Sequence, residues 1–169
     1  KDFHTYYVGK TKLWVHNMNT HGIPGLTVQK SSNKISWILE RGGKKTTHKA
    51  ELSSKGYVEL DIRLPSEARG EGIGVKMLDE SLEHFGNKVK GIEANWTMHP
   101  DYPDSQSLGL KQFWQSYEVF EGNLSGKALW EAATKSTKLW GLAKERGFTK
   151  MHFPYTPERD EVSVIFLKE

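Results

Sequence analysis

A glycine-rich stretch in the middle of the chain has residue types and spacing suited to binding an anion. It occupies residues 69–74 and reads Arg-Gly-Glu-Gly-Ile-Gly. Residues 57–65 before it alternate apolar and polar side chains as a half-buried strand does, and residues 75–85 after it carry apolar side chains at helical spacing. The order strand, glycine turn, helix brings the unpaired N–H groups of a helix N-terminus beside residues without a Cβ atom. Because the helix dipole favours negative charge at this end, the stretch predicts a cradle for phosphate or pyrophosphate.

The spacing within this stretch separates it from other phosphate-binding loops. It is Arg69-x-x-Gly72-x-Gly74, which is neither the dinucleotide pattern G-x-G-x-x-G nor a P-loop ending in Lys-Ser or Lys-Thr. The pattern resembles the acyl-CoA signature R/Q-x-x-G-x-G/A of the GNAT superfamily of N-acetyltransferases. A second element is similar to that family at residues 139–148, where a predicted helix ends in Gly147-Phe148 and a strand follows. The resemblance covers roughly residues 25–169.

The resemblance implies an α+β fold and acetyl-CoA as co-substrate. The expected architecture is a mixed, mostly antiparallel sheet flanked by helices. In it, strands 57–64 and 89–96 form a parallel pair that splays apart to admit the acyl-CoA. Backbone N–H groups at 62–64 are expected to polarise the thioester carbonyl. The residues expected at the cofactor site are Ile62, Arg63, Leu64, Arg69, Gly70, Glu71, Gly72, Ile73 and Gly74.

Acetyl transfer to an amine also needs a base for the amine and an acid for the departing thiolate. Many GNAT members place a tyrosine acid four residues before the Gly-Phe pair. That position is Ala143 here, so the role is empty or filled from elsewhere, and Tyr102, Tyr117 and Tyr155 are the candidates. The candidate bases are Glu59, Asp61, Glu93 and His99, each of which has an ordinary surface role as the alternative. Glu93 and Asp61 are preferred because both alternate away from the apolar face.

The first 17 residues hold a second group with possible chemistry. Residues 3–9 and 13–17 resemble the last two motifs of an intein-like (HINT) pretoxin domain, His-Thr-Tyr-x-Val-Gly and Leu-x-Val-His-Asn. There an Asn side-chain amide attacks its own main-chain carbonyl, forms a succinimide and releases the next residue as a new N-terminus. The resemblance implies Asn17 in that role, assisted by His16 and His4. The HINT nucleophile is absent from this sequence, so we expect little self-cleavage.

HINT pretoxin domains precede the C-terminal toxins of bacterial polymorphic toxin systems, which act in bacterial competition such as contact-dependent inhibition. The resemblance therefore implies a HINT remnant at 1–17, a linker at 18–25 and a toxin domain at 26–169. It also implies secretion or cell-surface delivery, action in the target-cell cytoplasm and a cognate immunity protein. The favoured acceptor is the amine of aminoacyl-tRNA, because blocking it stops translation, and a protein amine is the competing acceptor. A basic hairpin compatible with tRNA is predicted at Arg41, Lys44, Lys45 and Lys49.

Two other classes of function stay open. One is a GNAT-like fold that has lost catalysis and acts by binding, and the other is a nuclease toxin. The 169 residues contain no cysteine, which excludes a disulfide framework and a thiol nucleophile. Their net charge is +3. No apolar run is long enough to span a bilayer, and the seven histidines lack the paired spacing of a zinc site. The remaining pattern predicts strands at 26–30, 34–40, 44–52, 150–154 and 162–167, a helix around 110–117, and a helix over 125–146 that breaks near Ser136.

Overall fold

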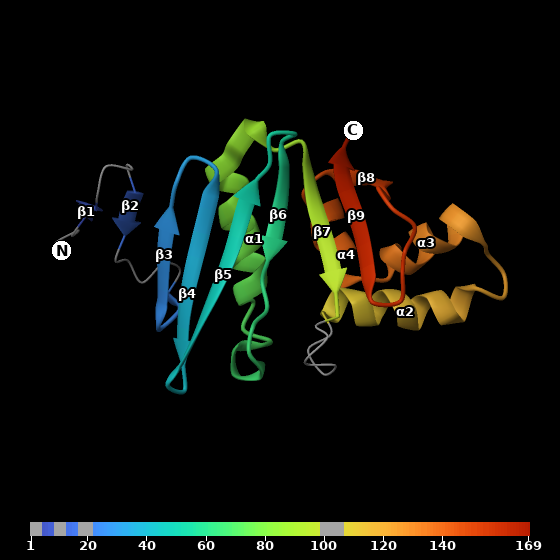
Figure 1. Ribbon diagram of the computed structural model, residues 1–169, viewed down its shortest axis with the longest axis horizontal. Helices are drawn as coiled ribbons and strands as arrows, with labels where there is room; N and C mark the ends of the chain where they lie inside the picture. The colour runs from blue at the N-terminus through green and yellow to red at the C-terminus, as the bar shows by residue number, and fades with distance from the viewer. Residues whose placement is uncertain (1–4, 9–12, 17–21, 99–106) are drawn as a thin grey trace. The chain divides into compact units, whose positions relative to one another are not determined.

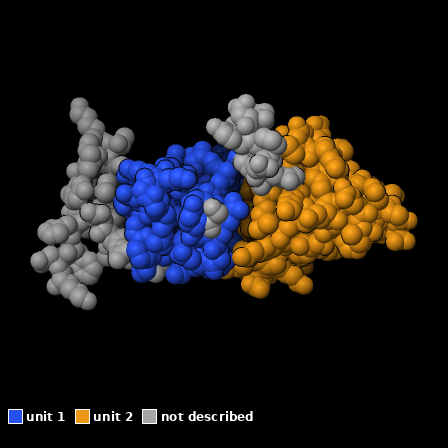
Figure 2. Space-filling model, turned by 90° about the horizontal axis from the view of Figure 1, so that it is seen from below, with its two compact units in different colours: residues 1–89 blue, residues 90–169 orange. Residues whose placement is uncertain are grey.

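The computed structural model describes residues 5–8, 13–16, 22–98 and 107–169, and it confirms the α+β class expected from the sequence (Figure 1). The chain divides into two compact units, residues 1–89 and 90–169 (Figure 2). This division is separate from the boundary predicted at residues 18–25, which stays a prediction. The two strands of the expected parallel pair are both present, as β6 in the first unit and β7 in the second.

The first unit is an antiparallel sheet with strands in chain order and one long helix. Each strand pairs antiparallel with the next, from β1 to β6. The elements are β1 (Thr5–Val8), β2 (Leu13–His16), β3 (Leu26–Lys30), β4 (Lys34–Arg41), β5 (Lys44–Leu52), β6 (Tyr57–Asp61), α1 (Ile73–Phe85) and the short 3-10 helices η2 (Ser66–Ala68) and η3 (Gly86–Lys88).

One face of this sheet and one face of α1 form the core of the first unit. Ile35, Trp37 and Leu39 alternate inward along β4 and are fully buried. Ile73 and Met77 of α1 are buried as the helical periodicity predicted. Period-2 burial in the strands and period-3.6 burial in the helix therefore position α1 over the sheet.

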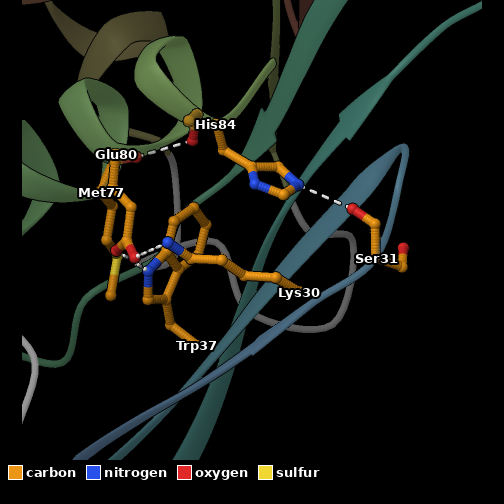
Figure 3. Close-up of polar contacts among 7 residues, drawn as sticks. Lys30, Ser31, Trp37, Met77, Glu80 and His84 are labelled. Atoms are coloured by element: carbon orange, nitrogen blue, oxygen red, sulfur yellow. Dashed lines mark hydrogen bonds and ion pairs between the residues drawn. The ribbon is translucent and has the colours of Figure 1, made fainter. Parts of the chain in front are cut away.

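A buried carboxylate joins α1 to two strands (Figure 3). Glu80 is 5 % exposed, and its Oε2 accepts a hydrogen bond from the indole N–H of Trp37 on β4 at 2.8 Å. Its Oε1 pairs with Nζ of Lys30 on β3 at 2.7 Å. One turn later, the Nε2–H of His84 donates to the carbonyl oxygen of Ser31 at 2.7 Å. Because buried polar groups are costly unless paired, these contacts fix how α1 sits on β3 and β4.

In its described residues, 90–98 and 107–169, the second unit has a three-stranded antiparallel sheet and three α-helices. Its strands lie in the order β7-β9-β8, so β9, the strand predicted at 162–167, is central and pairs with both others. Ring contacts join helices to strands, with Phe113 against Trp96 at 6.4 Å and Trp140 against Phe166 at 5.7 Å between centroids. The elements are β7 (Gly91–Thr97), α2 (Leu108–Phe120), α3 (Gly126–Lys135), α4 (Lys138–Glu145), β8 (Phe148–His152) and β9 (Glu161–Lys168).

The helix predicted over 125–146 does break near Ser136, into α3 and α4. Thr137 caps α4, because its Oγ1 accepts the N–H of Trp140 at 3.3 Å. Ser125 is the N-cap residue of α3, but its hydroxyl makes no capping bond. Gly126, the first residue of that helix, has a φ of 53, so the backbone after Ser125 does not have the geometry of an ordinary N-cap. Gly147 follows α4 with φ 84, as expected of a glycine that ends a helix.

Candidate functional site

The glycine turn and the start of α1 lie where the sequence predicts an anion cradle. Gly70 and Gly72 have φ values of 85 and 73, a backbone conformation that favours glycine. Gly72 is the N-cap of α1, and as a glycine it offers no side-chain cap. The first turn of α1 also contains no acidic residue. The positive end of the helix dipole is therefore not offset by a side chain of its own cap or first turn.

The space beside this turn suits a ligand that approaches the backbone closely. A Cβ atom added at Gly70 or Gly72 would meet no atom of the described residues within 4 Å. Gly74 differs, because a Cβ there would come within 3.8 Å of Cδ1 of Leu64, which is ordinary contact. Two of the three glycines thus keep the backbone accessible, and the arrangement fits a phosphate or pyrophosphate group.

Two arginines hold the turn in place. Nε of Arg69 donates to the carbonyl oxygen of Leu64 at 3.1 Å, which closes the loop between β6 and α1. Nη2 of Arg41, at the end of β4, lies 2.9 Å from Oε2 of Glu71. The β4–β5 hairpin is therefore tied to the glycine turn by an ion pair. Nε of Arg41 is buried and has no hydrogen-bond partner among the described residues.

The chain leaves the β5–β6 ladder earlier than predicted. The sequence predicted a strand to Leu64, whereas β6 ends at Asp61, opposite Lys49. Beyond it, the backbone N–H of Arg63 donates to Nδ1 of His48 on β5 at 3.3 Å. Nε of Arg63 also lies 3.8 Å from Oδ1 of Asp61. A side chain thus takes the place of a backbone partner at the position where the carbonyl-polarising N–H groups were expected.

His48 was not among the residues predicted for the site. It is 1 % exposed, lies opposite Trp37, and its Nε2 is 3.0 Å from Oγ1 of Thr46. Burial lowers the pKa of His48 below its ordinary value of 6.5, and the carboxylate of Asp61 acts in the opposite direction. The alternation along β5 could have identified His48 as a buried residue, because it places the side chains of Thr46, His48 and Ala50 on the inner face.

The candidate bases lie in different environments. Glu59 and Asp61 are exposed on β6, on the opposite face from the buried Val58. Glu93 is half-buried on β7 of the second unit, opposite Ile165 of β9. The structure therefore brings Glu59 and Asp61 together on one face of one strand.

The candidate acids are spread over several parts of the chain. Ala143 is fully buried on α4, so no acid acts from that position. Tyr117 packs on α2 against Trp114, with ring centroids 4.8 Å apart. Tyr155 is 73 % exposed. His99 and Tyr102 lie outside the described residues.

Two of the four positive charges of the basic hairpin are paired with carboxylates. Arg41 pairs with Glu71, and Nζ of Lys49 lies 3.7 Å from Oε1 of Glu51. Lys44 and Lys45 are exposed where β5 begins, after the tight turn. These two lysines are the part of the predicted patch best placed to meet a phosphate backbone.

The predicted autoprocessing residues fall mostly outside the described part of the chain. His4 and Asn17 lie outside it, and His16 is the last residue of β2. β2 pairs antiparallel with β3, with His16 opposite Val28 and Trp14 opposite Lys30. The segment that carries His16 is therefore an added strand of the first unit's sheet.

Comparison of the chain with models of protein families, with curated proteins and with solved structures found no match. No helix in the described part of the chain has both the length and the apolar character needed to cross a membrane. Within the same part, His, Asp and Glu side chains form no group of three that could hold a metal ion.

Proposed function

We propose that residues 26–169 transfer an acetyl group from acetyl-CoA to an amine, and that the chain acts as a bacterial toxin. The observation that carries this proposal is the glycine turn between β6 and α1. It combines two glycines at positive φ, open space beside them and a helix N-terminus without a side-chain cap. These features suit a pyrophosphate, and their order along the chain is that of the acyl-CoA signature.

Residues around this turn would hold the co-substrate. In this scheme the backbone N–H groups of residues 70–74 would bind the phosphates, and those of residues 62–64 would contact the reactive group. When bound, acetyl-CoA supplies a thioester whose carbonyl carbon accepts the amine while the carbon–sulfur bond breaks. The chain's own contribution is to orient the amine, remove its proton and donate hydrogen bonds to the carbonyl oxygen.

The proton of the amine goes to a carboxylate in this scheme. Asp61 stands at the end of β6, next to the strand end that donates to the carbonyl, and Glu59 lies two residues earlier on the same exposed face. Glu93 on β7 is the alternative base, with His99 as a further candidate, and Tyr102 remains a candidate acid for the departing thiolate. Asp61→Asn, Glu59→Gln and Glu93→Gln should be compared for kcat across pH. The true base is the one whose loss removes the acid limb of the profile.

The favoured acceptor is the amine of aminoacyl-tRNA. Exposed Lys44 and Lys45 support it, since a tRNA acceptor arm presents phosphates. The toxin role rests on the resemblance of residues 1–17 to a pretoxin ending. It carries with it secretion or surface delivery, action in the target-cell cytoplasm, and an immunity protein as partner.

Isothermal titration of the full chain with acetyl-CoA tests the co-substrate. CoA and ADP serve as ligand controls. Gly72→Asn keeps a residue that tolerates positive φ but fills the open space, so it should weaken acetyl-CoA binding at least about tenfold. Gly147→Asn makes the same change at the end of α4, also at positive φ and in open space, and should leave binding unchanged. Equal affinity for all three proteins would rule out the cradle, and absence of any binding would direct attention to nuclease activity.

A second candidate function is a GNAT-like fold that acts by binding alone. Ala143, buried and without a titratable group where many members have tyrosine, favours it. Acetyl-CoA binding without release of free thiol in the presence of charged tRNA or proteins would establish this second function.

A further inference from the structure

His48 forms a complete hydrogen-bond chain from β4 through β5 to Arg63, two residues beyond the end of β6. The backbone N–H of Arg63 can only donate, so Nδ1 of His48 accepts and carries no proton. In the neutral ring the proton then lies on Nε2, which donates to Oγ1 of Thr46 at 3.0 Å. The hydroxyl of Thr46 donates in turn to the carbonyl oxygen of Leu39 at 3.4 Å. Both ring nitrogens are thereby satisfied in a site that is almost wholly buried.

The register of the strands shows what this ring replaces. The N–H of Ser53 bonds to the carbonyl of Tyr57, so the odd-numbered residues of β6 turn their backbone groups toward β5. Arg63 belongs to the same odd series. Continuation of the ladder past the Lys49–Asp61 pair would set Arg63 opposite Thr47. Its N–H instead donates to the imidazole of His48. The ring therefore replaces the backbone acceptor of Thr47 at the point where the chain leaves the ladder.

The same alternation orients the neighbouring donors. If the N–H of Arg63 points toward β5, those of Ile62 and Leu64 point away from it in an extended chain. These are the N–H groups that the proposed reaction assigns to the thioester carbonyl. A shift of the backbone at Arg63 would displace both donors, because each lies in a residue directly bonded to Arg63.

We propose that His48 is a positioning residue that holds the end of β6 so that the N–H groups of Ile62 and Leu64 meet the reacting carbonyl. This inference rests on the proposed acetyl transfer. A buried histidine that only filled space would need neither a defined tautomer nor an acceptor at Nδ1. An apolar side chain of similar size would serve that purpose, so His48→Leu separates packing from positioning.

The first arm of the test needs no ligand. In the full chain labelled with ¹⁵N, Nδ1 of His48 should show the shift of an unprotonated nitrogen at neutral pH, and the Arg63 amide should be protected from exchange. A protonated Nδ1, or a rapidly exchanging Arg63 amide, would overturn the proposal. This arm gives an answer even if His48→Leu fails to fold.

The second arm measures turnover as thiol release from acetyl-CoA with charged tRNA as acceptor. His48→Leu should lower kcat about tenfold to a hundredfold while the affinity for acetyl-CoA changes little, because the donors are displaced and the glycine turn is not. His48→Gln, whose amide oxygen can accept from Arg63, should recover most of kcat. His152→Leu, at an exposed position on β8, is the matched control. A folded His48→Leu protein with unchanged kcat would overturn the positioning role.

The two proposals fail in different ways. If the unaltered chain neither binds acetyl-CoA nor releases thiol, the proposed function is wrong, and with it the purpose assigned to His48. If the unaltered chain is active and His48→Leu has the same kcat as the His152→Leu control, the proposed function stands and the positioning role is wrong.

Discussion

The indole N–H of Trp37 lies 2.8 Å from Oε2 of Glu80, and both side chains are buried between the sheet and α1. This bond links the centre of β4 to the helix that begins at the glycine turn. The position of the candidate cradle therefore depends on a contact two turns away from it along α1.

Replacing Glu80 should test that dependence. Glu80→Ala leaves the buried Trp37 N–H without its acceptor, and should lower the free energy of unfolding by about 1–3 kcal/mol. Urea unfolding followed by tryptophan fluorescence measures the change. Glu83→Ala, at an exposed position on the same helix, should change stability by less than about 0.5 kcal/mol. Equal effects of the two variants would contradict the structural role of Glu80.

Stability should fall as the pH drops below 6.5. Burial keeps the pKa of His48 below this ordinary value, so the unfolded chain takes up a proton that the folded chain refuses. The free energy of unfolding therefore decreases as pH falls from 6.5 toward the folded pKa, by at most about 1.4 kcal/mol per pH unit. Unfolding across this range in the unaltered chain, His48→Gln and His152→Gln measures it. Only His48→Gln should lose the His48 contribution, and identical pH profiles for all three would contradict it.

Two glycines inside helices should respond in opposite ways to alanine. A Cβ at Gly109 on α2 would lie 2.3 Å from Nε1 of Trp96, so Gly109→Ala must displace the indole and should cost about 1–3 kcal/mol. Gly141 on α4 has open space, and Gly141→Ala should stabilise by about 0.5–1 kcal/mol. Thermal unfolding of both variants would show shifts of opposite sign, and a stabilised Gly109→Ala would disprove the close contact.

The basic hairpin should matter for a tRNA acceptor and not for the co-substrate. Lys44→Glu with Lys45→Glu should weaken binding of charged tRNA and reduce the salt dependence of log K by about two units of slope. Affinity for acetyl-CoA should not change. Lys144→Glu, the same charge reversal at an exposed position on α4, is the control. If tRNA binding is indifferent to the hairpin lysines, a protein amine becomes the favoured acceptor.

The purified chain should keep its first 17 residues. Asn17 and His16 resemble a cleavage site, but the 169 residues contain no cysteine that could serve as a thiol nucleophile. Intact-protein mass spectrometry after prolonged incubation should show the full 19.3 kDa chain. Quantitative loss of the segment would show that Asn17 and the histidines suffice. Asn17→Ala then tests whether the loss is chemical or proteolytic.

Local patterns predicted most of the strands and helices because burial follows their periods closely. β3, β5 and the break between α3 and α4 lie where the alternation and the capping residues placed them. Gly70 and Gly72 likewise have the positive φ that a glycine turn requires. These features depend on neighbours in the chain, so they can be read from sequence.

Features that depend on distant partners were not predicted. Glu80 and Ser81 are buried on α1, which the apolar spacing of residues 75–85 does not indicate; Trp37 and Lys30 supply the partners of the Glu80 carboxylate. β6 ends at Asp61 because a side chain on β5 replaces the next ladder bond. The sequence around Glu80 and Asp61 contains no local pattern that indicates these distant partners.

The pairing of β2 with β3 changes what a break after Asn17 would achieve. Trp14 and His16 stand opposite Lys30 and Val28, so the segment before the break would remain hydrogen-bonded to the sheet. Scission and release would then be separate events, and the two fragments would persist as a complex. The lifetime of that complex, not the chemistry at Asn17, would set when the edge of β3 becomes open to another strand.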